Sequence, residues 1–357
     1  MRRLRQWMSV VVFAVLVAAL AVRRDDLGAA LAEIGRLDAA WYVLLASLIA
    51  VGIVVDGVYT QSVTPQLSIA RAIMVQQAAT ASNNTVIGSG PVATGLRIAM
   101  MRSWGISDAS IAVSILALNV IAAYRLWLIA LATAIAGLAG ADGGVLDSRV
   151  YVVVVVVASV VLSGSTLLWW VLLRHPIVAI RIARLMQRAW DRLRRRVVRL
   201  PDIGIVAFTA HSHEEALDLV RLRRWRILVA VVADQAITIA KPLAVVRAFG
   251  IGSDELSTWQ VLIAYGLVRL VVALTPIPGG IGVTELGLAA LLVRFGGDEA
   301  VVLAAVLTFR ALTFALPIVT GGICFLAWRF EHRRPANEHL GSSTKSARCA
   351  TDDRRRV

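Results

Sequence analysis

Long apolar runs, separated by short polar or basic stretches, fill the chain from its first residues to about residue 330. A helix that crosses a bilayer needs ~20 mainly apolar residues. Seven runs approach that length, at 7–22, 41–63, 110–138, 150–173, 227–249, 259–275 and 299–327. Two further segments, 75–105 and 276–296, are apolar but interrupted by Gly, Pro and polar residues. The pattern predicts an all-α polytopic integral membrane protein.

The positions of the arginines predict how the helices are oriented, because basic residues accumulate in cytoplasmic connections. Arginines cluster at 2–5, throughout the connection 174–226 and at 329–334, whereas the loops 139–149 and 250–258 contain few. Both termini are therefore expected in the cytoplasm of a multi-pass cell-membrane protein. If 276–296 crosses the bilayer and 75–105 re-enters it, there are about eight transmembrane helices. The N-terminal segment resembles a signal peptide, but a retained helix is favoured because "LVAALAVRR" runs directly into charge.

The composition agrees with a membrane protein, and in such a protein the positive net charge is interpreted as a topology signal. Hydrophobic residues make up 58% of the 357 residues and charged residues 17%, with a formal net charge of +14, whereas soluble domains have ~45–50% apolar and ~25% charged residues. Because the arginines mark topology, we expect no nucleic-acid partner. The two cysteines, Cys324 and Cys349, indicate no disulfide framework.

The cytoplasmic connection contains an amphipathic segment, 177–199, with arginines and apolar residues on separate stripes. Such a helix can lie at the membrane surface with its arginines toward anionic headgroups, or it can act only as a topology signal. His211, His213 and Glu214 do not have the spacing of a strong metal site, and a solvated helix start is favoured. Residues 1–330 are expected to form one membrane domain and 331–357 a disordered tail.

An internal repeat relates the two interrupted segments. At an offset of 190 residues, 88–113 align with 278–303, and each copy precedes a long apolar span. Five positions are identical: Gly90/Gly280, Thr94/Thr284, Leu96/Leu286, Ala99/Ala289 and Asp108/Asp298. Paired interrupted segments in two halves of a transporter mark its substrate site. The predicted topology makes this an inverted repeat.

The second interruption, "TPIPGGIGVTELGL", breaks a helix where lipid cannot satisfy backbone polar groups. The break therefore predicts a cavity, lined by Pro276, Pro278, Gly279, Gly280 and Gly282. The helix that restarts there offers free N–H groups to an anion. Glu285, in its first turn, has two interpretations. It caps those N–H groups, or it faces the cavity toward a cationic headgroup, a proton or an arginine.

Ionisable residues inside apolar spans are costly and are candidates for function. They are Asp56, Arg125, Asp234, Lys241, Arg269 and Arg310, joined by Arg97 at the end of the first interrupted segment. If they converge on one midplane cavity, its positive excess favours an anionic ligand such as a lipid phosphate. The alternative is that the acids pair with the arginines only to hold helices together.

The motif "PIPGGIGVTELGL" resembles a signature of the lysylphosphatidylglycerol synthase transmembrane-region family, and "SNNTVIGSGPVATGLRIAMMRSWGI" is similar to its first-half element. The resemblance covers about residues 5–330. It implies a flippase-type lipid domain and assigns site positions to Pro276, Pro278, Gly279, Gly280, Gly282 and Glu285, and to Asn83, Asn84 and Arg97. Where the family usually has a Gly-Glu pair, this chain has Ala93-Thr94-Gly95. No transferase domain is expected after residue 330, so lysyl-lipid synthesis is not implied.

These patterns predict transbilayer movement of a phospholipid or lipid-linked headgroup, without an ATP site or other cofactor. A non-transporting scaffold that binds anionic lipid or a lipid-synthesis enzyme is the main alternative, and the chain could also associate with itself. A lipid-modifying enzyme that uses Glu285 as a base is disfavoured, because no nucleophile or metal set lies beside that residue in the sequence.

Overall fold

The computed structural model describes residues 37–85, 89–175, 205–275 and 277–332, together with isolated positions at 35 and between 180 and 188. Within these residues every regular element is a helix, as the apolar runs predict. The predicted first helix at 7–22 and the tail after residue 332 lie outside the described residues. So does most of the basic segment 177–199.

The helices follow one another in two groups, separated by the undescribed connection. The first group comprises α3 (Ala39–Val63), α4 (Ile69–Thr85), α5 (Ser89–Ser103), α6 (Asp108–Leu138) and α7 (Ser148–Arg174). The second comprises α9 (Ile205–Ala248), α10 (Thr258–Leu274), the 3₁₀ turn η1 (Pro278–Gly280), α11 (Val283–Arg294), α12 (Glu299–Arg310), the π-helical η2 (Ala311–Ala315) and α13 (Leu316–Glu331).

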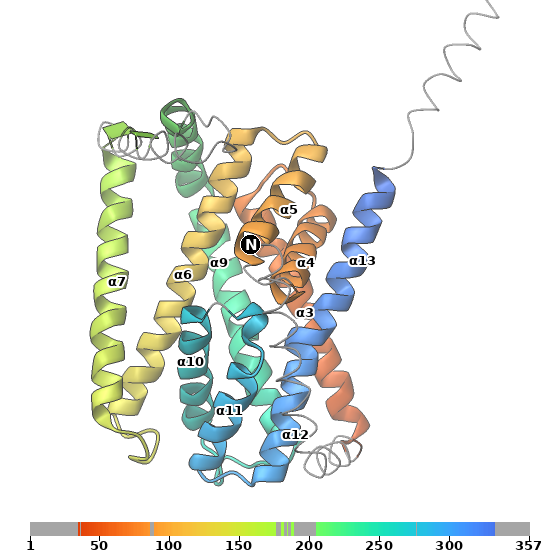
Figure 1. Cartoon of the computed structure of the whole chain (residues 1–357), viewed down its shortest axis with the longest axis vertical. Helices are drawn as coiled ribbons and strands as arrows, with labels where there is room; N and C mark the ends of the chain where they lie inside the picture. The colour runs from red at the N-terminus through yellow and green to blue at the C-terminus, as the bar shows by residue number, and fades with distance from the viewer. Residues whose placement is uncertain are drawn as a thin grey trace, which may run out of the picture.

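Five described helical segments are long and apolar enough to cross a membrane. They are α3, α6, α7, the part of α9 from Arg221 to Ala248, and the continuous α12–η2–α13. Figure 1 shows them running along the long axis of the bundle, between two ends that are named here by the loops they contain. The upper end contains residues 64–68 and 104–107, and the lower end contains residues 139–147, 249–257 and 295–298.

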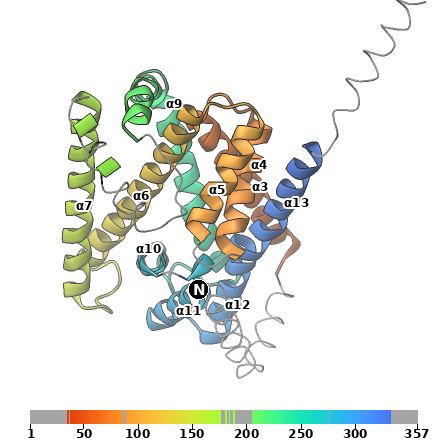
Figure 2. The same cartoon turned by 45° about the horizontal axis from the view of Figure 1, so that its top comes forward.

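The two interrupted segments form helical hairpins that enter the bundle from opposite ends (Figures 1 and 2). The α4–α5 hairpin opens at the upper end, where Gln66 Nε2 donates a hydrogen bond to Ser110 Oγ over 3.3 Å. The α10–α11 hairpin opens at the lower end, where a Cβ placed on Gly297 would lie 3.1 Å from Leu256. The segment 75–105 therefore re-enters, as predicted.

The sequence leaves open whether 276–296 crosses the bilayer or re-enters it, and the structure favours re-entry together with 259–275. These segments are the two arms of the α10–α11 hairpin, whose ends lie together at the lower end. With 17 residues, α10 has a length of ~25 Å at 1.5 Å per residue, which is less than the ~30 Å of a hydrocarbon core. The α10–α11 hairpin is accordingly not among the five described segments that are long and apolar enough to cross.

The order of elements repeats with the predicted offset. Adding 190 to the bounds of α4 gives 259–275, against Thr258–Leu274 for α10. Adding 190 to the bounds of α6 gives 298–328, against 299–331 for α12 to α13. Because α4 starts at the upper end and α10 at the lower end (Figure 1), the two copies run in opposite directions. The structure thus has the inverted arrangement that the repeat predicts.

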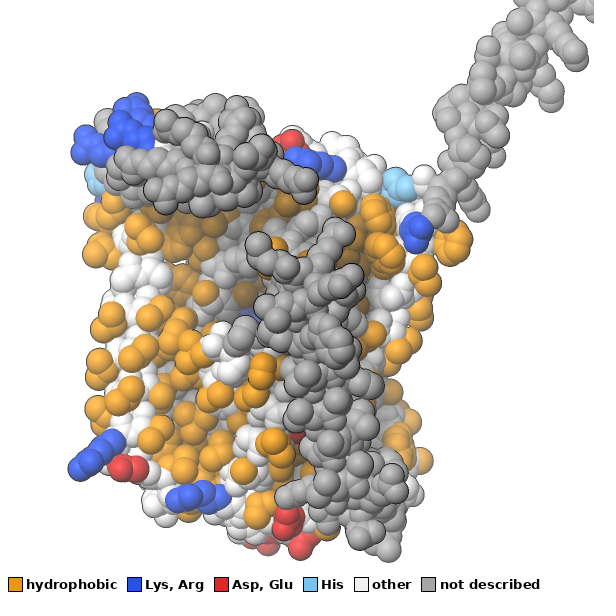
Figure 3. All heavy atoms as spheres, in the orientation of Figure 1, with side chains coloured by type: hydrophobic (Ala, Val, Ile, Leu, Met, Phe, Trp, Pro, Cys, Tyr) orange, Lys and Arg blue, Asp and Glu red, His pale blue; other side chains and the backbone are white. Residues whose placement is uncertain are grey.

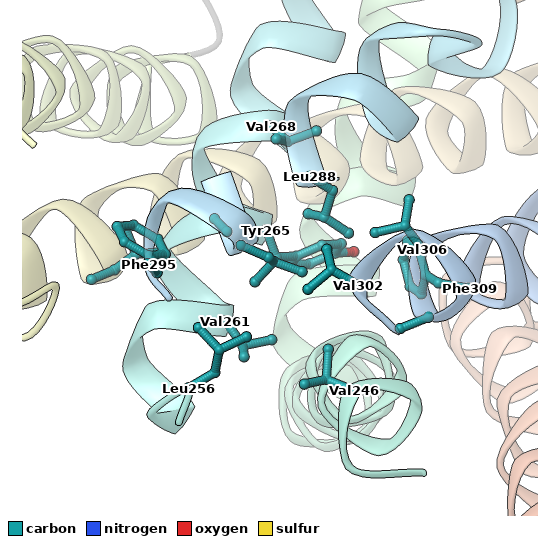
Figure 4. Close-up of a cluster of buried hydrophobic side chains, with 14 of the residues drawn as sticks. Val246, Leu256, Val261, Tyr265, Val268, Leu288, Phe295, Val302, Val306 and Phe309 are labelled. Atoms are coloured by element: carbon teal, nitrogen blue, oxygen red, sulfur yellow. The ribbon is translucent and has the colours of Figure 1, made fainter. Parts of the chain in front are cut away.

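The largest buried cluster lies in the lower half of the bundle, where α9, α10, α11 and α12 meet (Figure 4). At its centre Tyr265 and Phe309 pack edge to face, with ring centroids 6.0 Å apart. Outside this core the surface between the two ends is largely apolar, and most of the charged side chains visible in Figure 3 lie toward those ends. A surface of this kind matches a hydrocarbon environment.

Candidate functional site

The tip of the α10–α11 hairpin is a glycine turn that other residues could not form. Gly279, Gly280 and Gly282 have φ values of 58°, 63° and 80°, in the left-handed region that glycine enters at low cost. A Cβ on Gly279 would also overlap the ring of Phe314. The turn therefore lies directly against η2, in the middle of the bundle.

Glu285 connects this turn to the last spanning helix. Its Oε2 accepts a hydrogen bond from the backbone N–H of Gly282 over 2.7 Å, and its Oε1 pairs with Nε of Arg310 over 2.7 Å. Arg310 Nη2 also donates to the Gly279 carbonyl over 3.1 Å. Glu285 thus caps the helix and pairs with an arginine at the same time. The carboxylate side chain is still 24% exposed, against 11% for Arg310.

The tip of the other hairpin contacts the same place. Asn84, near the end of α4, donates a hydrogen bond to the Phe314 carbonyl over 3.3 Å, and Phe314 lies 4.7 Å beneath the guanidinium of Arg310. Phe314 is in the π-helical turn, where the N–H of Leu316 reaches back five residues to Ala311. π-turns inside helices are frequent at functional sites. The two hairpin tips therefore meet through η2.

A second polar cluster joins α6 to α9. Arg125 forms an ion pair with the buried Asp234. Its Nε donates to Gln235 Oε1 over 2.9 Å, and its Nη2 donates to Thr238 Oγ1 over 3.4 Å. The guanidinium also lies 5.8 Å from the ring centroid of Tyr59 on α3. Arg125, itself on α6, is thus held by α3 and α9, one helix from each half of the repeat.

Asp56 extends the second cluster along α3. It lies beside Asp234, and both Lys241 and Arg125 are close enough to act on its charge. Lys241 lies against Gly52, where a Cβ would be 3.3 Å from its Nζ. The charge of Arg97 also reaches Asp56. Two acids and three bases thus meet around this cluster, so it has a formal excess of one positive charge.

Arg97 and Arg269 are less completely paired. Arg97 Nη2 donates to Gln76 Oε1 over 2.8 Å, while its buried Nε has no hydrogen-bond partner among the described residues. Arg269 lies on α10 with its guanidinium 5.8 Å from the ring centroid of Tyr265. No ion pair joins Arg269 to any carboxylate in the described ranges.

A small pocket opens between α6, α9 and α10, with a volume of about 90 Å³. It is lined by Ala122, Arg125, Leu126, Ile129, Gln235 and Arg269. Ala122 and Arg269 are exposed, and the lining residues lie near the middle of α6 and of the apolar part of α9. The pocket therefore opens sideways on the bundle, midway between its two ends.

The structure brings together some of the residues predicted from sequence and separates others. Glu285, Arg310, Gly279, Gly282 and Asn84 form the contact between hairpin tips; Gly280 is in the same turn, as is Pro278. Arg125, Asp234 and Asp56 form the second cluster. Asn83 belongs to neither cluster. Two groups of charges thus replace the single predicted cavity, and the predicted acid–arginine pairing is present in both.

Several polar partners were absent from the predicted site. Gln235 and Thr238 bind Arg125, and Gln76 binds Arg97. Their only sequence signal is a polar residue inside an apolar run, which is weaker than a charge. No group of three or more potential metal ligands occurs in the part of the chain that the structure describes.

The fold and site define a class: a multi-pass helical membrane protein with two re-entrant hairpins that meet at polar tips. The family model described as the lysylphosphatidylglycerol synthase TM region matches residues 6–321, and the chain belongs to this family. The match is to the membrane region of such synthases, which is distinct from their catalytic part. No match was found among curated proteins or solved structures.

Proposed function

We propose that the protein moves the polar headgroup of a membrane lipid across the bilayer, along the contact between the two hairpin tips. The observation that carries this proposal is the contact of Gly279 and Asn84 with the same η2 turn. Broken helices from opposite ends that meet mid-bundle are the arrangement in which transporters bind their substrates.

The polar groups at the contact support a path for a headgroup. Backbone outside a regular helix is tolerated at this depth only within protein or beside a wet cavity. Glu285 and Arg310 offer an acid and a base that both remain partly exposed. A zwitterionic or anionic headgroup can therefore exchange its own charges for those of the pair. The family match to a lipid-synthase membrane region agrees with a lipid substrate.

Glu285→Gln tests this path in vesicles of defined lipids that carry a fluorescent, tail-labelled phosphatidylglycerol. We expect wild-type protein to speed the exchange of label between leaflets over protein-free vesicles. We expect Glu285→Gln to slow it by roughly tenfold, because the passing headgroup loses one charge-assisted interaction, and ~1.4 kcal/mol is equivalent to a factor of ten in rate. Glu331→Gln, which breaks an exposed pair with Arg71, should leave the exchange rate unchanged.

A further variant separates transport from folding. Glu285→Gln leaves the positive charge of Arg310 without its partner, which also lowers stability. The double variant Glu285→Gln/Arg310→Gln restores neutrality, so its thermal unfolding midpoint should recover while lipid exchange stays slow. If the wild-type protein exchanges lipid no faster than protein-free vesicles, the proposal fails and a scaffold becomes the better interpretation. Normal exchange in the double variant would remove these two residues from the path.

A further inference from the structure

The pocket between α6, α9 and α10 lies outside the contact of the hairpin tips and has its own chemistry. Three of its six lining residues are polar: Arg125, Gln235 and Arg269. Its volume of about 90 Å³ is well above the ~10–15 Å³ that one water needs by this measure. It can therefore admit one small polar group, with apolar side chains of α6 beside it.

The polar lining of this pocket consists mainly of hydrogen-bond donors. Gln235 Oε1 is occupied by Arg125 Nε, which fixes the orientation of the amide, because only its oxygen can accept. The amide nitrogen, Nε2, is consequently a donor, and it is buried without a partner among the described residues. An unsatisfied buried donor costs ~1–3 kcal/mol, so a ligand that accepts its hydrogen bond gains that energy.

Arg269 adds a positive charge that the described part of the protein does not neutralise. Arg125 is balanced by Asp234, whereas the contact of Arg269 is with the ring of Tyr265. An arginine within the membrane is costly unless it is paired. Arg269 is also exposed, so an anion arriving from the side of the bundle can reach it.

We propose that this pocket binds the phosphate-ester anion of a membrane lipid, with Arg269 and the Gln235 amide as its donors. Guanidinium groups form paired hydrogen bonds with phosphate oxygens, and the Gln235 N–H supplies a further donor. The pocket opens toward the region that acyl chains occupy, so the chains remain in the bilayer while the phosphate enters. This proposal deepens the proposed function, because it names the substrate class and the place of lateral entry.

Binding of a tail-labelled phosphatidylglycerol to the full chain in uncharged detergent micelles tests the pocket. We expect Arg269→Gln to weaken binding about tenfold, the loss of one charge-assisted interaction, and Arg269→Lys to weaken it less. Leu126→Trp, which fills the pocket without removing a charge, should weaken binding as well. Arg149→Gln, an equivalent change at an exposed position on α7, should not. Labelled diacylglycerol, which lacks the phosphate, should bind equally to all variants.

Two competitors identify the source of the anion. Unlabelled phosphatidylglycerol should displace the probe, whereas inorganic phosphate at millimolar concentration should not. Displacement by inorganic phosphate would keep the anion site but overturn the assignment to lipid. Wild-type binding by both Arg269→Gln and Leu126→Trp would overturn the site itself. Because Leu126→Trp retains every charge, weak binding by both variants at normal unfolding temperatures supports a pocket and not a folding defect.

Lipid exchange measured on the same variants separates this inference from the proposed function. If Arg269→Gln loses binding but exchanges lipid at the wild-type rate, the pocket is a lipid site away from the path. If Arg269→Gln binds normally while Glu285→Gln loses exchange, the pocket is overturned and the proposed function stands. Loss of both activities in Arg269→Gln, with Arg149→Gln normal, places lateral entry at this pocket.

Discussion

Glu285 shows how one side chain can hold two elements together at the tip of a hairpin. A carboxylate in the first turn of a helix stabilises the free N–H groups there, and Glu285 does so through Gly282. The same carboxylate accepts from Arg310 on the next spanning helix. Loss of this residue therefore affects both the turn and its contact with α12.

Asp142, in the loop between α6 and α7, gives a residue-scale prediction outside the apolar spans. Burial alone raises the pKa of Asp142, but hydrogen bonds from the N–H groups of Leu146 and Gly144 and from the Tyr151 hydroxyl outweigh burial and lower it. The carboxylate therefore stabilises the fold most fully above its usual pKa of 3.8. This stabilisation is lost as the pH falls through the lowered pKa of the folded state.

Asp142→Asn should lower stability by about 1–3 kcal/mol at neutral pH, because at least one buried donor loses its acceptor. The difference from wild type in thermal unfolding midpoint should be constant near neutrality and shrink below about pH 4. Asp147→Asn is the matched control, since Asp147 caps α7 at an exposed position and Asn caps helices as well as Asp. A pH-independent difference for Asp142→Asn would contradict the role of its charge.

At this scale the sequence predicted which residues have unusual roles, but only part of how they are paired. The glycines and Glu285 were identified because a helix break inside an apolar run is visible without a structure. The specific pairing of Glu285 with Arg310 was not identified. The two residues are 25 positions apart, with a turn between two helices in between, and such a separation does not determine which side chains meet. Gln235 was missed because a neutral amide resembles any other tolerated polar residue.

Among the elements, α4 and α13 pack backbone against backbone, and a glycine permits it. A Cβ placed on Gly321 would collide with the Gln77 carbonyl and with the Ala81 side chain. Small residues allow membrane helices to pack backbone against backbone. Gly322, the next residue, faces open space, because a Cβ placed on it would have no neighbouring atom within 4 Å.

Gly321→Ala should therefore destabilise the protein by about 1–3 kcal/mol, the usual cost of overpacking. Gly322→Ala should be neutral or slightly stabilising, because alanine favours a helix over glycine by ~1 kcal/mol. Thermal unfolding midpoints of the two purified variants in the same detergent provide the comparison. Equal midpoints would show that α4 and α13 can move apart at no cost.

The helical elements were largely predictable from the length of the apolar runs. The main exception is α9, which begins at Ile205, well inside the predicted basic connection, and not near residue 227. The error concerned α10, which resembles a span because it is apolar throughout and nearly long enough. A hairpin arm that packs among other helices is apolar for the same reason as a span. Composition alone does not separate the two arrangements, and the break at Pro278–Gly280 left re-entry of 276–296 open.

For the whole molecule, the two hairpins enter from opposite ends, and labelling of introduced cysteines tests this topology. In a variant without Cys324 and Cys349, Asp254→Cys and Asp298→Cys should react with a membrane-impermeant thiol reagent from one side. Arg102→Cys should react from the other side. Thr275→Cys, beside the mid-bundle turn, should react far more slowly than all three. Rapid labelling of Thr275→Cys from the Arg102 side would mean that α10 crosses the membrane after all.

The two halves share one topology but differ in how their hairpins are packed. In one half α10 packs against α6 through Gly266 and Thr133, but a small open pocket remains between the two helices beside Arg269. In the other half, α4 is closed against α13 through Gly321. Halves related by an inverted repeat can exchange their conformations, which produces alternating access. If the protein moves lipid as proposed, such an exchange would close the pocket beside Arg269 and separate α4 from α13. Under the proposed function, the closed contact at Gly321 is the position where a second opening would form, between α4 and α13.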